Sequence, residues 1–263
     1  MGAVTIRGVP ETMLQTLWAR AMETQKPKPH FSDPTAVDIL RKLDYNFAAA
    51  EHDKAMSTGV IARTILLDRM TGGYLRSHPD TVVVNLACGL DTRCCRMAGQ
   101  YKRWYNVDLP EAMEVRKRFL TESDSVRQIA CSAMDPAWAD QIDCGDHPVL
   151  VIIEGLTMYL KEEDVKQIFS IIREHFPRVL VFVETMNPWV QAHMKEKSIE
   201  NSQAKFTWGV KNGEELKPLV PGFRHLTDLS LVEGMKVFLP VYRFLGKFSF
   251  VRNISNKILV FEK

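Results

Sequence analysis

Acidic side chains that directly follow short strand-like segments are the residues of this sequence best placed for chemistry. Asp108 follows the segment 104–107, and Glu154 follows the apolar run 149–153. In open parallel sheets, ligands bind beyond the carboxyl ends of the strands, where a carboxylate can accept hydrogen bonds from both hydroxyls of a ribose. A buried carboxylate without a partner is unfavourable, which favours a site role for Glu154. The two positions predict a nucleoside site, with a helix N-cap as the alternative role of Asp108.

The loop Ala87-Cys88-Gly89 ends the first predicted strand and is the second candidate element. Its small residues allow a ligand to approach the backbone where the next helix opens. Thr92 stands where a dinucleotide fingerprint requires a third glycine, which disfavours a nicotinamide cofactor. Asp91 opposes a pyrophosphate but suits a cationic group. The loop therefore favours a ligand with adenosine, a positive centre and an amino-acid end, and S-adenosylmethionine has these parts.

Two further positions would complete such a site. Asp135 follows the third predicted strand, where it could accept from the exocyclic amine of adenine while Met134 packs on the ring. Arg63 lies on a helix ahead of the sheet and is the candidate for the methionine carboxylate, because a guanidinium binds a carboxylate in a bidentate manner. Plainer roles stay open: a cap before Pro136 for Asp135, and a solvated helix face for Arg63.

These side chains require an α/β framework. Strands are predicted at 82–86, 104–108, 125–131, 149–154 and 179–184, with helices between them, one of them at 162–175. This alternation predicts a mostly parallel sheet with helices on both faces. Helices at 11–23, 35–43 and 53–70 precede it, the last ending before Gly72-Gly73. Segments 248–251 and 257–261 are expected to form an antiparallel terminal hairpin. We interpret 1–263 as one domain: a helical cap region (1–80), a cofactor-binding core (81–184), and an acceptor-side insertion with terminal strands (185–263).

Composition excludes several classes of protein. With 46% hydrophobic residues among 263, the chain can bury a sizeable core, and a net charge of +2 predicts neither a nucleic-acid partner nor an anionic membrane. The five cysteines form no C-x-x-C pair and match no histidine cluster, which predicts reduced thiols and no metal site. The sequence shows no secretory signal, so we expect a cytoplasmic protein.

Three motifs in this order resemble the leucine carboxyl methyltransferase superfamily, and within it the tetracenomycin-type polyketide O-methyltransferases. The order and spacing of the three are more specific than any one of them, and Ser32-Asp33-Pro34 and Arg63-Thr64 match the N-terminal elements, so the resemblance covers about residues 30–190. The motifs are Gly89-Leu90-Asp91-Thr92-Arg93, Asp108-Leu109-Pro110-Glu111, and Glu154-Gly155-Leu156-Thr157-Met158-Tyr159-Leu160.

The resemblance implies a Rossmann-like class I methyltransferase that uses S-adenosylmethionine. Ala87 stands where the family usually has glycine, and if that position has a positive φ, the alanine costs about 1 kcal/mol or more. The residues that the resemblance and the residue types together assign to the cofactor are Arg63, Ala87, Gly89, Asp91, Asp108, Leu109, Met134, Asp135 and Glu154.

For the reaction, we expect methyl transfer to a hydroxyl or carboxyl group of a small molecule. The alternatives are methylation of a protein's C-terminal carboxylate, nicotinamide-dependent oxidation, and cofactor binding without turnover. An acceptor pocket is expected between the N-terminal helices and segment 185–208, and no catalytic base is assigned. The pocket residues are Met186, Trp189, Met194, Phe206 and Trp208, and the candidate bases are Tyr159, His193 and His225.

Overall fold

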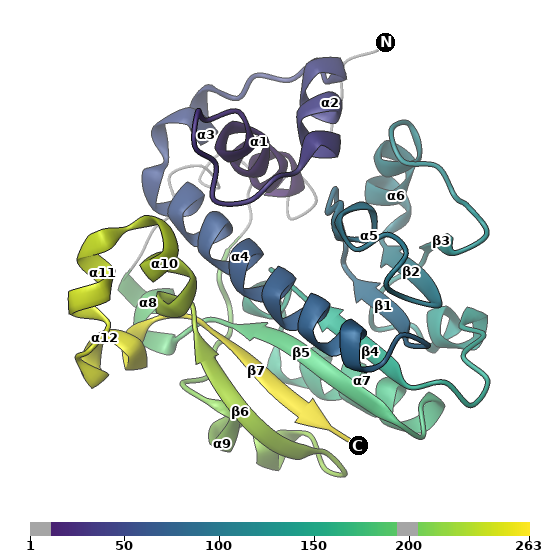
Figure 1. Cartoon of the computed structure of the whole chain (residues 1–263). Coiled ribbons are helices and arrows are strands. Elements are labelled where there is room, and N and C mark those ends of the chain that lie inside the picture. The colour runs from purple at the N-terminus through teal and green to yellow at the C-terminus, as the bar shows by residue number, and fades with distance from the viewer. Residues whose placement is uncertain (1–11, 194–204) are drawn as a thin grey trace.

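A seven-stranded sheet forms the centre of the computed structural model, which describes residues 12–193 and 205–263 (Figure 1). The strand order is β3-β2-β1-β4-β5-β7-β6. The first five strands are parallel, and β7 is antiparallel to both β5 and β6. The direction in which successive strands are added therefore reverses between β1 and β4, and open α/β sheets bind ligands at this switch point. The strands are β1 (Val82–Leu86), β2 (Arg103–Asp108), β3 (Val126–Ala130), β4 (Val149–Ile153), β5 (Val179–Thr185), β6 (Arg224–Ser230) and β7 (Lys257–Glu262).

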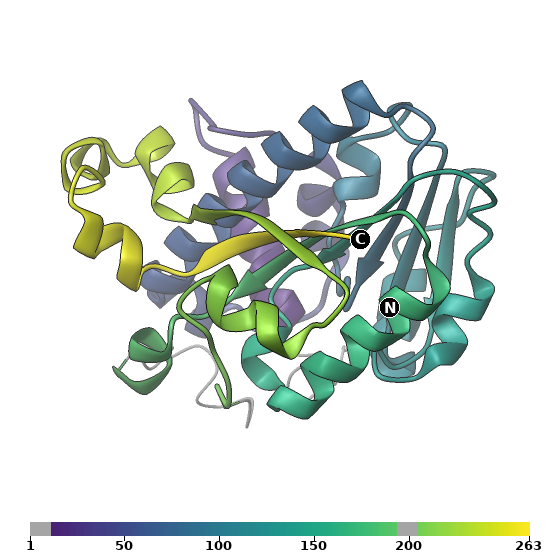
Figure 2. The same cartoon turned by 90° about the horizontal axis from the view of Figure 1, so that it is seen from below.

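Helices cover both faces of this sheet, as the sequence predicts. β1 and β4 are buried at every residue, which explains their continuous apolar runs. On one face lie α4 (Lys54–Ser77), α5 (Arg93–Arg96) and α10 (Val232–Phe238), and on the other α7 (Glu162–His175), η2 (Pro136–Gln141) and α9 (Gly213–Leu216). Figure 2 shows α4 and α7 on opposite sides of the strands. Helix α6 (Pro110–Lys117) follows β2, and the short η3 (Thr157–Tyr159) follows β4.

The N-terminal helices sit over the carboxyl end of the sheet. They are α1 (Thr12–Thr24), α2 (Pro34–Lys42) and α3 (Ala48–His52). Asp33 caps α2 by accepting a hydrogen bond from the Ala36 amide, and Pro34 begins the helix. Leu14 and Leu17 of α1 pack with Leu90 and with Ala112 of α6. The loop after β1 is therefore covered by α1.

The helix that the sequence predicts at 53–70 is α4 in the structure, and it is longer than predicted. α4 does not end before Gly72-Gly73 but continues to Ser77, and Leu75 in its last turn is fully buried against the sheet. Burial of that side chain outweighs the roughly 1 kcal/mol that each interior glycine costs. Because α4 packs on the sheet, only α1–α3 lie above it. The three-part division of the domain stays an interpretation.

The predicted terminal hairpin is half wrong. Lys257–Glu262 is a strand, but residues 249–254 form α12 (Ser249–Ile254) instead of its partner. Strand β7 already has β5 on one side and β6 on the other, so no free edge remains for 248–251. The rest of the C-terminal half consists of α8 (Pro188–His193), η4 (Lys217–Leu219) and α11 (Pro240–Leu245).

Candidate active site

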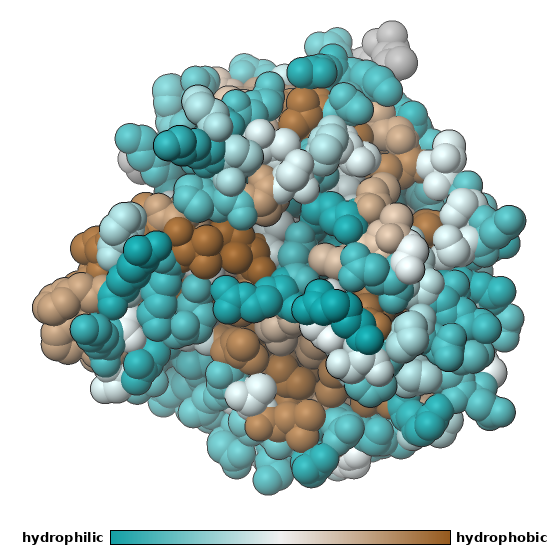
Figure 3. Space-filling model, in the orientation of Figure 1, coloured by the Kyte–Doolittle hydropathy of each residue, from teal (hydrophilic) through white to brown (hydrophobic). Residues whose placement is uncertain are grey.

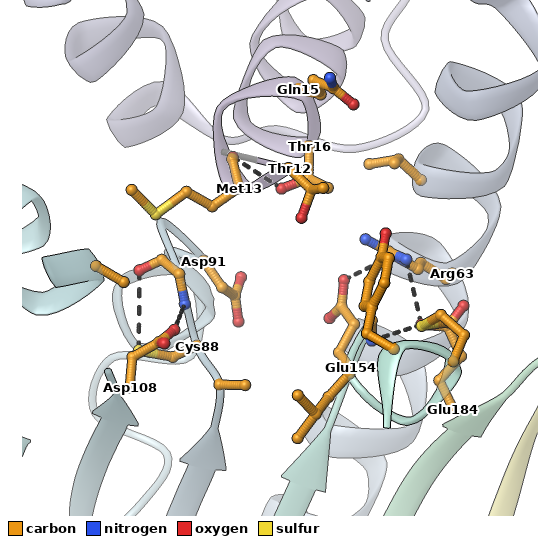
Figure 4. Close-up of a pocket in the computed structure, with 18 of the residues that line it drawn as sticks. Thr12, Met13, Gln15, Thr16, Arg63, Cys88, Asp91, Asp108, Glu154 and Glu184 are labelled. Carbon is orange, nitrogen blue, oxygen red and sulfur yellow. Dashed lines mark hydrogen bonds and ion pairs between the residues drawn. The ribbon is translucent and has the colours of Figure 1, made fainter. Parts of the chain in front are cut away.

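A cavity of about 300 Å³ lies where the carboxyl ends of β1, β2, β4 and β5 meet α1 and α4 (Figure 4). It is located at the switch point between β1 and β4. Eight of the nine predicted cofactor residues line it: Arg63, Ala87, Gly89, Asp91, Asp108, Leu109, Met134 and Glu154. The sheet thus brings together residues that are up to 91 positions apart in the chain.

The loop after β1 is shaped by two left-handed residues. Gly89 has a φ of 46° and Ala87 a φ of 53°. Among the described residues other than glycine, Ala87 has a positive φ. The positive φ that the sequence analysis considered for Ala87 is therefore present, and the left-handed conformation costs this alanine about 1 kcal/mol or more of conformational free energy. A Cβ on Gly89 would lie 2.8 Å from Cβ of Met13, so this position admits only glycine beneath α1.

Buried arginines brace the same loop from two sides. Arg20 of α1 donates to the carbonyl of Leu90 at 2.7 Å and pairs with Asp33. Arg116 of α6 donates to the carbonyls of Gly89 and Asp91 at 2.8 and 2.7 Å. These bonds hold the backbone in the conformation that opens the cavity.

Asp108 ends β2 inside the cavity, and its two oxygens accept from different backbone amides. Oδ2 accepts from Gly89 at 2.6 Å and Oδ1 from Leu109 at 2.7 Å. Burial raises the pKa of this carboxyl, and the two amides and Arg116 oppose that rise. Helix α6 has Leu109 at its N-cap with no side-chain cap. Asp108 therefore ties β2 to the β1 loop, and the capping alternative does not describe it.

The third strand end behaves differently. Met134 lines the cavity with Ala133 and Ser132, but Asp135 is exposed and is not among the lining residues. Its carboxylate accepts from the Ala137 amide and caps η2. The plainer role is thus the one that the structure shows, and an adenine contact of Asp135 stays a prediction.

Opposite Asp108, the cavity ends in a cluster of charges. Arg63 pairs through Nε with Glu154 at 2.9 Å and through Nη1 with Glu184 at 3.2 Å. Glu154 also accepts from Arg93 at 2.8 Å. Arg63 is therefore not a solvated surface arginine, because its guanidinium lies at the cavity wall between two carboxylates (Figure 4).

Arg93 is the hub of the charges behind this wall. It is 1% exposed and bonds Asp68, Asp91 and Glu154 at 2.7 to 2.8 Å. Burial raises the pKa of Asp91, but Arg93 and its neighbouring arginines outweigh it and hold the pKa well below the usual range. Asp91 is thus ionised near pH 7. It accepts a hydrogen bond from the Arg93 amide and also lines the cavity.

Sequence reasoning missed Glu184, and although it expected the N-terminal helices at the acceptor pocket, it named no residue of α1 there. Glu184 follows the apolar part of β5 just as Glu154 follows β4, so the same signal could have found it. It is 2% exposed, accepts from the Gly155 amide at 2.8 Å, and has its pKa raised by burial. Nothing in the sequence marks Thr12, Met13, Gln15 and Thr16 as cavity residues, because α1 reaches the site only through tertiary packing.

Part of the cavity wall is apolar and rich in methionine. Met56, Met158 and Met186 line it, and the rings of Tyr159 and Phe206 lie 5.5 Å apart at its wall. Of the predicted acceptor residues, Met186 and Phe206 are therefore present. Trp189 is half exposed, Trp208 packs against the core behind the sheet, and Met194 lies outside the described residues.

Of the three candidate bases, only Tyr159 lines the cavity. His193 bonds the Trp189 carbonyl and stacks on that indole. His225 lies on β6 between Glu214 and Asp228, which raise its pKa against the effect of burial. Both histidines therefore have structural partners away from the site.

Residues 13–173 match the model of the family described as leucine carboxyl methyltransferase. The chain belongs to the leucine carboxyl methyltransferase family. It is 35% identical over 233 residues to the tetracenomycin polyketide synthesis O-methyltransferase TcmP of Streptomyces glaucescens, covering 88% of this chain and 86% of that protein. It is 28% identical over 246 residues to the S-adenosyl-L-methionine-dependent methyltransferase dpfgK of Gibberella zeae, covering 85% and 83%.

Solved structures agree on the fold. The magnesium protoporphyrin IX methyltransferase of Synechocystis superimposes with a TM-score of 0.52 at 12% identity, over 87% of this chain and 94% of that one. A SAM-dependent methyltransferase from Anabaena variabilis gives 0.50 at 14% identity, over 77% and 84%. The family-level findings establish this protein as an S-adenosylmethionine-dependent methyltransferase, and the nicotinamide and binding-only alternatives are set aside.

The cavity of this methyltransferase is compatible with that cofactor. It offers the carboxylate of Asp108, an apolar wall at Leu109 and Met134, and an end that carries charges of both signs. Residues 12–193 and 205–263 contain no cluster of three metal-ligating side chains and no helix with the length and hydropathy of a membrane span. All five cysteines are free thiols.

Proposed function

We propose that this methyltransferase transfers the methyl group to a hydroxyl or carboxyl oxygen of a small, largely apolar molecule. The observation that carries the proposal is the apolar part of the cavity lining, which contains Met56, Met158, Met186 and the ring pair of Tyr159 and Phe206. Methionine and aromatic side chains suit flat organic ligands, and methionine adapts to irregular shapes. At about 300 Å³ the cavity is at the small end of ligand pockets. The O-methyltransferase TcmP, named for tetracenomycin polyketide synthesis, supports the same class of acceptor.

The cofactor would lie between the two polar ends of the cavity. We assign Asp108 to the ribose, Leu109 and Met134 to the faces of the adenine, and Glu154 with Arg63 to the amino and carboxylate groups of the methionine part. Both oxygens of Asp108 already accept one backbone amide, and their remaining lone pairs are available to hydroxyl donors. Asp135 would reach the adenine only if its carboxylate left the Ala137 amide.

Arg63 must hold a ligand carboxylate while two protein carboxylates compete for it. Its bonds to Glu154 and Glu184 fix the guanidinium before any ligand arrives. Arg93 satisfies the second oxygen of Glu154, so this glutamate is shared between two arginines. The arrangement holds the Arg63 guanidinium in one orientation beside two carboxylates, and charges of both signs at one place suit a zwitterionic amino-acid end.

Catalysis by this chain then rests on position more than on proton transfer. S-adenosylmethionine supplies a methyl group on a sulfonium, and the reaction is an in-line displacement. The protein's part is to hold the acceptor oxygen within about 3 to 3.5 Å of its target with water excluded. Helix α1 covers the site through Met13 and Thr16, and Tyr159 is placed to orient the acceptor. A carboxylate acceptor is already ionised near pH 7 and needs no base.

The test is transfer of a labelled methyl group from S-adenosylmethionine to small-molecule extracts and, separately, to proteins. We expect label in a small molecule, loss of transfer in Asp108→Asn, and a changed acceptor preference in Phe206→Ala with cofactor affinity retained. Leu226→Ala, on β6 away from the cavity, is the matched control. Label recovered only as a base-labile ester at a protein C-terminus would overturn the proposal and establish the alternative reaction.

A further inference from the structure

The corner of the molecule formed by α11 and α12 exposes large apolar side chains. Val241, Phe244, Phe248 and Phe250 are 56%, 61%, 51% and 68% exposed. They are four of the seven large hydrophobic residues that are exposed in the described part of the chain. Figure 3 shows apolar atoms gathered at this corner, which projects from one end of the molecule in Figures 1 and 2. We call these four residues, with the basic residues named next, the basic aromatic surface.

The charges on this surface have one sign. Arg243, Lys247 and Arg252 are exposed, and residues 234–261 contain no aspartate or glutamate. The nearest acid along the chain, Glu233, is paired with Lys236 at 2.7 Å. Helix α8 lies next to α12 through a hydrogen bond from Asn187 to the Asn253 carbonyl, and residues 185–193 contain no acid. Within residues 12–193 and 205–263, these neighbouring elements therefore bring no unpaired acid to the positive charges of the surface.

These features point to a particular kind of partner. A second copy of this chain would bring like charges together across a symmetric contact, which is unfavourable. A folded protein partner generally needs a broad complementary surface, whereas Phe244 and Phe250 lie on two helices of six residues each and Phe248 lies between those helices. Protruding aromatic side chains surrounded by lysine and arginine suit the interface of an anionic bilayer. We propose that the basic aromatic surface binds the surface of an anionic lipid membrane.

This proposal revises what the net charge of +2 predicts. That balance is a property of the whole chain, whereas residues 234–261 carry basic side chains and no acid. Each basic residue near an anionic surface contributes about 1 kcal/mol, so three of them suffice for reversible binding when aromatic side chains insert beside them.

The surface is continuous with the active site. The segment that carries it begins at Leu231 and ends at Asn256, and both residues line the cavity. Its first helix is fixed to α4, since a Cβ on Gly234 would lie 2.1 Å from the Ala62 carbonyl, next to Arg63. Membrane contact would therefore bring the cavity close to lipid. If the proposed apolar acceptor is correct, it could enter from the bilayer; the binding itself does not depend on that function.

The test is sedimentation of the full chain with vesicles of phosphatidylcholine alone or mixed with phosphatidylglycerol. We expect binding to the anionic vesicles that weakens with added salt and is nearly absent with phosphatidylcholine. Reversal of Arg243, Lys247 and Arg252 to Glu should weaken binding at least about 100-fold, because each lost positive charge costs about fivefold and each new carboxylate adds repulsion. The matched control reverses Lys117, Lys166 and Lys217, which are exposed on α6, α7 and η4 and change the net charge equally.

A second variant separates insertion from charge. Phe244→Ser, Phe248→Ser and Phe250→Ser together should lower vesicle affinity about tenfold while cofactor binding and the far-ultraviolet spectrum stay unchanged. Equal sedimentation with both vesicle types, or equal loss in the lysine control, would overturn the proposal. Concentration-dependent dimers that the serine variant abolishes, without vesicle binding by the parent protein, would instead assign the surface to a second copy.

Discussion

Ala87 allows the sharpest test of the site's local energetics, because its φ of 53° is imposed on an L-residue with a side chain. The left-handed region costs such a residue roughly 1 to 2 kcal/mol. Ala87→Gly removes that cost, while the greater freedom of glycine in the unfolded chain takes back about 0.4 to 1 kcal/mol. The variant should therefore raise the free energy of unfolding by about 0.5 to 1 kcal/mol, measured by urea denaturation at 25 °C.

Ala137→Gly is the matched control, because Ala137 is exposed within η2 and has no positive φ. Glycine there should lower the free energy of unfolding by about 0.5 to 1 kcal/mol, as in other helical positions. The two variants should thus change the free energy of unfolding in opposite directions, with a gap of about 1 to 2 kcal/mol between them. If Ala87→Gly destabilises the protein as much as Ala137→Gly does, the strain assigned to the loop is refuted.

Three further predictions concern the charges of the site. Asp108→Asn should weaken S-adenosylhomocysteine binding by about 1 to 3 kcal/mol in calorimetry, and unchanged affinity would limit the carboxylate to bracing the Gly89 loop. Burial raises the pKa of Asp68, but Arg96 and Arg93 outweigh it and hold the pKa below 3.8, so its stabilisation is present above about pH 4 and is lost as the pH falls through the folded-state pKa. The free energy of unfolding should accordingly differ between the parent and Asp68→Asn at pH 7 and converge in acid; a difference independent of pH would contradict this. Burial raises the pKa of the Glu184 carboxyl above its ordinary value, so its contribution to the free energy of unfolding is lost as the pH rises through the folded-state pKa. Glu184→Gln should flatten this decline in urea titrations that begin at pH 4.5 and proceed upward. An identical pH profile in both proteins would exclude that role.

Local sequence patterns identified most strands of the sheet and several of the residues that line the cavity. The runs at β1 and β4 are buried on both faces, so their sequence is apolar without interruption and easily recognised. α7 was predicted with its observed bounds because its apolar residues repeat at helical spacing. The position of Glu154 after β4 was enough to mark it, since a carboxylate at that point needs a partner.

Errors arose where packing outweighed local signals. Gly72-Gly73 is a sound stop signal, yet α4 continues because Leu75 is buried beyond it. Residues 248–251 alternate like a strand, but β7 has no free edge, and Phe248 and Phe250 are exposed on the surface instead. Asp135 follows a strand as Asp108 does, yet its side chain caps η2 in the structure, because the rule marks a strand end and not the direction of a side chain; its contact with adenine stays a prediction.

The sequence alone determined the family, the class of fold and the kind of cofactor, because these depend on motif order and on short-range periodicity. Tertiary structure decided which charges meet. It placed Arg63 between Glu154 and Glu184, made Arg93 the buried hub of three carboxylates, and laid α1 over Gly89. It also exposed the phenylalanines of the acid-free segment 234–261 at the α11–α12 corner. Contacts between residues distant in sequence are set by how helices dock on the sheet, and no local pattern encodes that docking.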